Sequence, residues 1–533
     1  MSKQLLLLFT LLFLPFYNVK SEEAFYPEST FFNRDEYFFL HTIERGQTVY
    51  SISLMYSVST EEIYRFNPES RYVIRAGDVL KIPQESSSYL FHTIQSQETL
   101  YGLSQRYHMK GEDIIAANPG LSIETFIIGK TIRIPTNRVT SPIQGGNEAL
   151  NSSRTNSLLS LIYPPKEVNI IKVALLLPFG LKENTASTKA TRSRMVEYLE
   201  GFLLALKDLK KEGVSVVLLL RDIGSGTKEI PEILKDREMQ DIHLMIGGFY
   251  DEQIKDEQIR LLSRFAKDKN IPYVIPFTSK SNEPFHNPNV YQINPPQSVL
   301  NSKASLAFCD KYSRDNIIIV TDDTGASNQK DFINLLRQDL HDKRIPYKTI
   351  PLRSNISTDI KILLSYYQKN IIVPSDDSTE TLSKLTTQLK SVVETQPGLS
   401  LSLFGYPVWQ VYNAKYSDHF FKLNTTFFTV FYSDPNAESV KTFYNTFYKW
   451  YTRTLENTFP KFGMLGYDTG IYFIRLIHKY GSQFDANVND LKHKGIQTDF
   501  YFERINNWGG FINTNMYLIN YNSNLSVTKD LVK

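Results

Sequence analysis

A motif that occurs twice constrains the fold of this 533-residue chain more than any other feature. The two copies span residues 41–83 and 92–135. Four residue types recur at equivalent positions: His41 and His92, Thr48 and Thr99, Asn67 and Asn118, and Pro68 and Pro119. An internal repeat indicates that one supersecondary unit is built more than once. The N-terminal part of the chain is therefore predicted to consist of two small units of the same fold.

Each copy is predicted to have the order strand, helix, helix, strand. Thr48 and Thr99 stand in N-cap position before apolar residues at helical spacing. Ser59 and Glu62 form a Ser-x-x-Glu capping box that predicts the second helix of the first copy. That helix ends before a proline in both copies, because the residue before proline disfavours the helical region. The alternating pattern predicts strands at residues 39–43, 79–82, 91–94 and 131–134.

This pattern resembles the LysM family, whose members are small βααβ units that bind glycans containing N-acetylglucosamine, chiefly peptidoglycan and chitin. The family's sugar groove lies between the loop after the first strand and the loop after the second helix. The resemblance implies glycan-binding residues in both copies: Gly46, Gln47, Thr48, Asn67, Pro68 and Ile74, then Gln97, Glu98, Thr99, Asn118, Pro119 and Ile128.

The family usually has Gly-Asp-Thr in the first loop. Gln47 departs from this pattern mildly, whereas Gln97 and Glu98 depart further and lose the glycine. The second copy therefore keeps the pattern of the fold but departs from the family in a loop that lines the sugar groove. A role for both modules in protein contacts alone is the alternative interpretation.

The N-terminus has the layout of a secretory signal, predicted over residues 1–21. Lys3 precedes an apolar run at residues 5–17, which is shorter than the roughly 20 residues that a bilayer crossing needs. We therefore expect an exported protein, located in the periplasm and associated with the cell wall. Cys309 is the single cysteine, so an intramolecular disulfide is excluded, and its apolar helical setting predicts a buried side chain.

Composition argues against several other classes of function. The net charge of +3 and the lack of a basic stripe beside aromatic residues make nucleic acid a poor candidate partner. The nine histidines show no HxH or HExxH spacing, so no metal site or cofactor is predicted. Cys309 lacks the histidine setting of a cysteine nucleophile. The chain is predicted not to be an enzyme.

Residues 137–168 are rich in Ser, Asn, Gly and Thr, which predicts a flexible linker. It separates the predicted modules at residues 38–84 and 90–136 from a domain at 169–533. In that domain buried-type strands alternate with helices, which predicts a doubly wound α/β fold in two lobes. The strands are predicted at residues 173–179, 214–220, 242–248, 272–277, 316–323, 370–375 and 401–406, and two of the helices at 195–211 and 326–341.

Residues 170–520 resemble the type I periplasmic binding proteins. The order of YLEGFLLAL (198–206), MIGGFY (245–250) and NVYQINPP (289–296), followed by FTVFYSD (428–434) and GYDTGIYFI (466–474), carries the resemblance. It implies a cleft that holds a small polar solute or amino acid. The cleft ligand candidates that best match the family are Thr278, Ser279, Tyr467 and Asp468. The alternative interpretation is that these are turn and helix-cap residues.

Together these features predict an exported, non-catalytic, peptidoglycan-binding protein whose two lobes act as a receptor or scaffold. One alternative is a solute-binding protein of an amino-acid or small-molecule ABC transport or sensing system. Another is a regulator of a peptidoglycan synthase or hydrolase that acts through contacts with an envelope protein.

Overall fold

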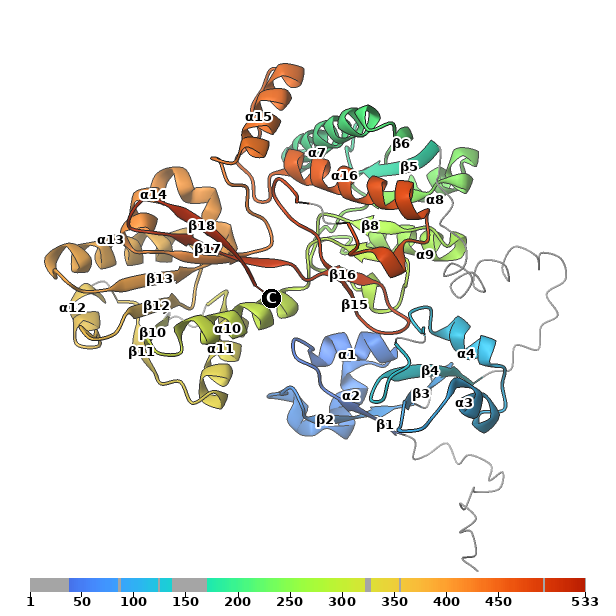
Figure 1. Ribbon diagram of the computed structural model, residues 1–533, viewed down its shortest axis with the longest axis horizontal. Helices are drawn as coiled ribbons and strands as arrows, with labels where there is room; N and C mark the ends of the chain where they lie inside the picture. The colour runs from blue at the N-terminus through green and yellow to red at the C-terminus, as the bar shows by residue number, and fades with distance from the viewer. Residues whose placement is uncertain are drawn as a thin grey trace, which may run out of the picture.

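The computed structural model describes residues 38–84, 88–122, 125–136, 170–321, 327–353, 356–491 and 494–532. The predicted signal and linker lie outside the described residues. The described part of the chain forms two small modules and two larger lobes, and the modules lie beside the lobes near α10 and the β15–β16 hairpin (Figure 1).

Each module is a two-stranded antiparallel sheet with two helices packed on it, as predicted. In module 1, β1 pairs with β2 so that Phe39 lies opposite Ile82, and in module 2, β3 pairs with β4 so that Leu90 lies opposite Ile134. Module 1 consists of β1 (Phe38–Thr42), α1 (Val49–Tyr56), α2 (Thr60–Phe66), the 3-10 helix η2 (Pro68–Arg71) and β2 (Val79–Pro83). Module 2 consists of β3 (Tyr89–Thr93), α3 (Leu100–Arg106), α4 (Gly111–Ala117) and β4 (Thr131–Pro135).

Lobe 1 is built on a seven-stranded sheet with the order β15-β16-β9-β8-β7-β5-β6. Five parallel strands run in the order β6-β5-β7-β8-β9, β16 extends them in parallel, and β15 closes the edge in the antiparallel direction. Its elements are β5 (Ile170–Leu177), α7 (Ala186–Lys211), β6 (Ser215–Asp222), α8 (Ile230–Lys235), η3 (Arg237–Asp241), β7 (Leu244–Gly247), α9 (Glu257–Lys269), β8 (Tyr273–Ile275), η4 (Glu283–Phe285), β9 (Val290–Gln292), α15 (Glu438–Tyr451), α16 (Phe462–Tyr480), η6 (Asp485–Asn487), β15 (Phe502–Arg504) and β16 (Phe511–Asn513).

Lobe 2 is also built on a seven-stranded sheet, with the order β11-β10-β12-β13-β14-β17-β18. Its first five strands are parallel, β17 runs antiparallel to β14, and β18 runs antiparallel to β17. Its elements are α10 (Gln297–Tyr312), β10 (Asn316–Thr321), α11 (Lys330–Asp342), β11 (Tyr347–Pro351), α12 (Ile356–Lys361), β12 (Asn370–Pro374), α13 (Thr379–Thr395), β13 (Leu401–Gly405), η5 (Pro407–Tyr412), α14 (Asn413–Lys422), β14 (Thr426–Thr429), β17 (Met516–Tyr521) and β18 (Val527–Val532).

The strand order confirms the predicted two-lobed, doubly wound fold. Alternate residues of β5 enter two different cores: Val173 and Leu175 pack on one face of the sheet and Ala174 and Leu176 on the other. Apolar side chains on both faces explain why this strand appears as a continuous apolar run in the sequence. Within the described residues the chain passes between the lobes three times, from β9 to α10, from β14 to α15 and from β16 to β17.

Two predicted helices differ from the structure in their first residues. The first begins at Ala186 instead of Met195, because the side chain of Thr185 accepts from the backbone N–H of Thr188 and caps it earlier. The second, α11, is assigned from Lys330, although residue 326, at its predicted start, lies outside the described residues.

Candidate functional site

A buried histidine holds the first loop of module 1, the loop that follows β1. Nε2 of His41 donates to Oε1 of Gln47 at 2.7 Å, which leaves Nδ1 to accept from the Tyr56 hydroxyl at 2.8 Å. Oε1 of Gln47 also accepts from the backbone N–H of Glu44 at 2.8 Å. Burial lowers the pKa of His41 from 6.5, although the hydrogen bond to Gln47 and the charge of Glu44 act to raise it. The first loop is therefore held by a neutral imidazole inside the module.

Module 2 repeats this arrangement with a carboxylate in place of the amide. Nε2 of His92 donates to Oε2 of Glu98 at 2.6 Å, and its Nδ1 lies 3.0 Å from the Tyr107 hydroxyl. The carboxylate also accepts from the Gln95 N–H at 2.8 Å and from Arg106 at 2.9 Å. Burial opposes ionisation, but these partners together hold the pKa of Glu98 below its ordinary value of 4.5. The repeated histidines thus support the loops in both modules, a role that the sequence patterns did not predict.

Other residues of the first loops cap a helix or allow a tight turn of the backbone. Thr48 accepts from Ser51 N–H and Thr99 from Gly102 N–H, each at 3.0 Å, so both are helix caps. Gly46 adopts a positive φ of 83°, and Gln97 has a φ of 66° at the equivalent position of module 2. The loop therefore keeps its shape in module 2 although the glycine is lost.

The asparagines that open the second loops are buried structural residues. Nδ2 of Asn67 donates to the carbonyls of Ile63 and Lys81, and its Oδ1 accepts from Lys81 N–H at 2.9 Å. Asn118 makes the same three bonds in module 2, to the carbonyls of Ile114 and Arg133 and the N–H of Arg133. Each asparagine joins the end of a helix to the closing strand, and Pro68 begins η2 directly after Asn67.

Exposed apolar side chains lie further along the second loops. Ile74 is half-buried against the core of module 1, whereas its neighbours Tyr72 and Val73 are 90% and 53% exposed. In module 2, Ile127 and Ile128 are 49% and 67% exposed. Tyr72 and Val73 are thus exposed apolar residues beside the sequence-predicted Ile74. Neighbouring exposed apolar side chains of this kind are suited to contact a ligand surface.

The modules also contact the lobes through their loops. Arg45, in the first loop of module 1, pairs with Asp339 of α11 in lobe 2. Tyr50, just after that loop, accepts through its hydroxyl from Nδ2 of Asn282 in lobe 1 at 2.8 Å. A turn at residues 505–510, which we call the docking hairpin, joins β15 to β16 and places Trp508 against the core of module 1.

In the predicted inter-lobe cleft, Thr278 and Ser279 follow β8, at the carboxyl end of the parallel strands of lobe 1. Thr278 is buried and its hydroxyl accepts from Lys280 N–H at 2.9 Å, which is a turn contact. Ser279 is half-buried. The adjoining Phe277 stacks on Phe462 with ring centroids 5.8 Å apart.

Tyr467 and Asp468 lie in the first half of α16. The Tyr467 hydroxyl donates to Asp208 of α7 at 3.0 Å. The carboxylate of Asp468 has no exposed surface and accepts from the backbone N–H groups of Ile496, Gln497 and Thr498. Burial raises the pKa of Asp468 to about 7, although the three backbone hydrogen bonds act to lower it. Among the described residues no hydrogen bond joins this pair to Thr278 or Ser279, and Asp468 holds a loop of lobe 1.

Gly466, directly before Tyr467 and Asp468, shows that their motif serves helix packing. A Cβ at Gly466 would lie 2.1 Å from the carbonyl oxygen of Tyr198 in α7. The GYDTGIYFI segment is therefore adapted to close packing between α7 and α16, which also lie together in Figure 1.

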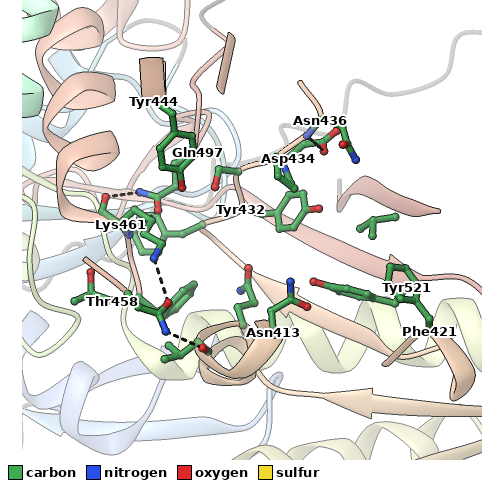
Figure 2. Close-up of a pocket in the computed structure, with 18 of the residues that line it drawn as sticks. Asn413, Phe421, Tyr432, Asp434, Asn436, Tyr444, Thr458, Lys461, Gln497 and Tyr521 are labelled. Carbon is green, nitrogen blue, oxygen red and sulfur yellow. Dashed lines mark hydrogen bonds between the residues drawn. The ribbon is translucent and has the colours of Figure 1, made fainter. Parts of the chain in front are cut away.

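A groove of about 450 Å³ lies where the second crossing meets both lobes (Figure 2). Tyr432 and Asp434 of the crossing line it, with Asn413 and Tyr521 from lobe 2 and Lys461 from lobe 1. Oδ1 of Asn413 is buried and has no hydrogen-bond partner among the described residues. The volume of the groove is in the range of small-ligand sites. None of the sequence-predicted cleft residues lines this groove.

Three further findings limit the chemistry of the described residues. In this part of the chain, no group of three or more His, Cys, Asp or Glu side chains could hold a metal ion. Among the described helices, none has the length and apolar content for a membrane crossing. Cys309 is buried as predicted, and burial raises the pKa of its thiol to about 12.

Comparison with known proteins identifies the two modules. The LysM domain family matches residues 41–83 and 92–135, so modules 1 and 2 are LysM domains. The Bacillus subtilis protein YdhD, whose name describes it as a putative sporulation-specific glycosylase, is 30% identical over 98 residues. That match covers 18% of this chain and 22% of YdhD. The LysM match supports binding to glycan that contains N-acetylglucosamine.

Solved structures similar to this chain include periplasmic binding proteins. An ABC transporter substrate-binding protein from Desulfitobacterium hafniense, solved in complex with Leu, has a TM-score of 0.41 and 13% identity, and the match covers 68% of this chain and 99% of that one. A branched-chain amino acid ABC transporter periplasmic ligand-binding protein from Burkholderia xenovorans has a TM-score of 0.44 and 12% identity, with 68% and 94% coverage.

Proposed function

We propose that this chain is an exported, non-catalytic protein of the cell envelope that binds peptidoglycan. In this proposal the LysM modules hold glycan that contains N-acetylglucosamine, and the two lobes act as a receptor or scaffold beside the wall. The observation that carries the proposal is the pair of LysM domains in which a buried histidine fixes the first loop and apolar side chains are exposed on the second.

Tyr72 provides the most direct test. Its side chain is 90% exposed, so Tyr72→Ala should leave the fold intact and remove only contact surface. Loss of an aromatic contact costs about 1 kcal/mol or more, so we expect roughly fivefold weaker binding or more. The measurement is co-sedimentation of the full chain with purified peptidoglycan sacculi over a range of sacculus concentrations.

Two further variants complete this test. Ile128→Ala should have a smaller effect in the same direction, because it removes an aliphatic side chain from module 2. Tyr367→Ala is the matched control, since Tyr367 is 100% exposed on lobe 2, and it should bind as the wild type does. A wild-type chain that stays in the supernatant would exclude a glycan anchor.

The groove in Figure 2 supports a second candidate function, the capture of a small polar solute. Asn413 supplies an unpaired acceptor, and the groove has both a carboxylate, Asp434, and an ammonium, Lys461, as an amino acid would require. Capture of a solute there would make the lobes a receptor instead of a scaffold. A thermal-shift titration with amino acids separates the two roles.

A further inference from the structure

The candidate glycan loop of module 1 is itself packed against lobe 2. A Cβ placed on Gly46 would lie 3.4 Å from Cβ of Ser302 in α10, which is van der Waals contact. The preceding Arg45 extends to Asp339 of α11, a carboxylate that also accepts from Ser305. One wall of the predicted sugar groove is therefore held against the lobe surface.

The second loop of module 2 is covered in a similar way by lobe 1. The backbone N–H of Gly120, directly after Asn118 and Pro119, donates to the carbonyl of Asn507 in the docking hairpin at 2.7 Å. Nδ2 of Asn507 in turn donates to the carbonyl of Thr131 at 2.9 Å. Each module thus has one of its two candidate glycan loops in contact with a lobe.

Trp508 of the docking hairpin fills the junction between the two modules. Its ring centroid lies 6.4 Å from that of Tyr56 in module 1 and 5.5 Å from that of Phe91 in module 2. The guanidinium of Arg133 lies 4.5 Å from the Trp508 ring centroid and 4.9 Å from that of Tyr89. This aromatic contact buries apolar surface and favours the docked arrangement.

The same junction leaves hydrogen-bond donors without acceptors. Nε1 of Trp508 and Nε of Arg133 are both buried and have no partner among the described residues. Arg133 also has no ion-pair partner there, although it is more than nine-tenths buried. Buried donors without acceptors are unfavourable, and water would satisfy both if the modules moved away. The docked arrangement is therefore stabilised by Trp508 and weakened by its own unpaired donors.

We infer that the lobe surface made by α10, α11 and the docking hairpin is an internal binding partner of the LysM loops, and that docking and glycan binding exclude each other. A glycan strand occupies the loops only when they leave the lobes, so wall binding frees the lobe surface. This inference rests on the proposed glycan-binding function and adds a means by which the lobes respond to the wall.

A reversible crosslink tests the inference in the full chain. The Gly46 and Ser302 positions are close enough for a disulfide, which needs a Cβ–Cβ separation of about 3.5–4.5 Å. Gly46→Cys combined with Ser302→Cys should therefore form a disulfide that holds module 1 on lobe 2. Cys309 is fully buried and should not interfere. The probe is chitotetraose, and its affinity is measured by calorimetry before and after reduction.

We expect the oxidised chain to bind chitotetraose roughly tenfold more weakly than the same chain after reduction, the factor that about 1.4 kcal/mol of competition would give. Because both measurements use one variant, any strain from a side chain at Gly46 cancels. Equal affinities in the two states would overturn the inference and leave the glycan anchor standing. No binding in the reduced variant and in the wild type would overturn both, and failure of the disulfide to form would overturn the docked arrangement.

Substitutions on the lobe side give an independent result without touching the glycan loops. Trp508→Ala removes the aromatic contact and Asp339→Asn weakens the Arg45 contact, so both should raise chitotetraose affinity above that of the wild type. The matched controls are Trp450→Ala, a tryptophan that is 56% exposed on α15, and Asp418→Asn, whose partner is Lys390 of α13, outside the docking surface. The controls should not change the affinity. Unchanged affinity in both lobe-side variants would contradict the exclusion.

Discussion

Gln97 shows how a single residue can depart from a family pattern while the loop keeps its shape. It has a φ of 66°, in the left-handed region, where the equivalent Gly46 has a φ of 83°. The left-handed region costs a residue with a Cβ about 1–2 kcal/mol of conformational energy. Glycine avoids this cost but loses more chain entropy on folding. The side chain of Gln97 is exposed, so it contributes little packing in return.

We therefore expect Gln97→Gly to stabilise module 2 by about 0.5–1 kcal/mol. The measurement is the free energy of unfolding from urea denaturation, followed by amide signals of module 2. The neighbouring Ser96 is also exposed but does not have a positive φ, so Ser96→Gly is the matched control. It should destabilise module 2 slightly. A Gln97→Gly chain that is less stable than the wild type would show that the side chain has a role in the native loop.

At the scale of the element, the first loops of the two modules have one shape and different chemistry. In module 1 a neutral amide, Gln47, accepts from His41, and in module 2 the carboxylate of Glu98 accepts from His92. The pKa of His41 is lowered from 6.5 by burial, so the stability it gives is complete above pH 6.5 and is lost as the pH falls through the lowered value. The pKa of Glu98 is lowered from 4.5, so its contribution is complete above pH 4.5 and is lost below that.

We therefore expect acid to begin to weaken the first loop of module 1 below pH 6.5 and the first loop of module 2 only below pH 4.5. Backbone amide signals of Gly46 and Gln97, recorded between pH 7 and pH 3 at constant ionic strength, would measure the two steps separately. Glu98→Gln should remove the low-pH step of module 2 and leave the step of module 1 unchanged. Simultaneous loss of both loops would mean that acid acts on the whole molecule.

The sequence was sufficient to predict those elements whose pattern is local. The capping box of Ser59 and Glu62 is present in the structure, and the Thr48 cap is confirmed. The central parallel strands of both lobes appear as apolar runs because both of their faces are buried. Strand β11 has no such run, since only one of its five residues is buried, and the sequence did not predict it. Strand β11 lies at the edge of its sheet, where little of it is buried.

At the scale of the whole molecule, contacts between distant segments could not be predicted. Trp508 lies in the segment NNWGG, which has no periodic pattern, yet it packs against two modules that are far from it in sequence. Asp468 follows a tyrosine in a motif that suggested a ligand site, but its carboxylate is satisfied by three backbone N–H groups in the core of lobe 1. Sequence identifies such residues as unusual, but only the tertiary structure shows which surface each one meets.

The groove in Figure 2 leads to a prediction at this largest scale, because its lining comes from both lobes and the crossing between them. A solute that binds there joins the lobes and should stabilise the folded chain by about 2.7 kcal/mol at a hundredfold excess over its dissociation constant. We expect glutamine or asparagine, polar amino acids whose side-chain amides can donate to Oδ1 of Asn413, to raise the melting temperature of the wild type at millimolar concentration. Asn413→Leu should abolish the shift, because it removes the unpaired acceptor, whereas Asn289→Leu, outside the groove, should retain it. If neither amino acid shifts the wild type, the receptor role loses its support and the lobes are better explained as a scaffold beside the wall.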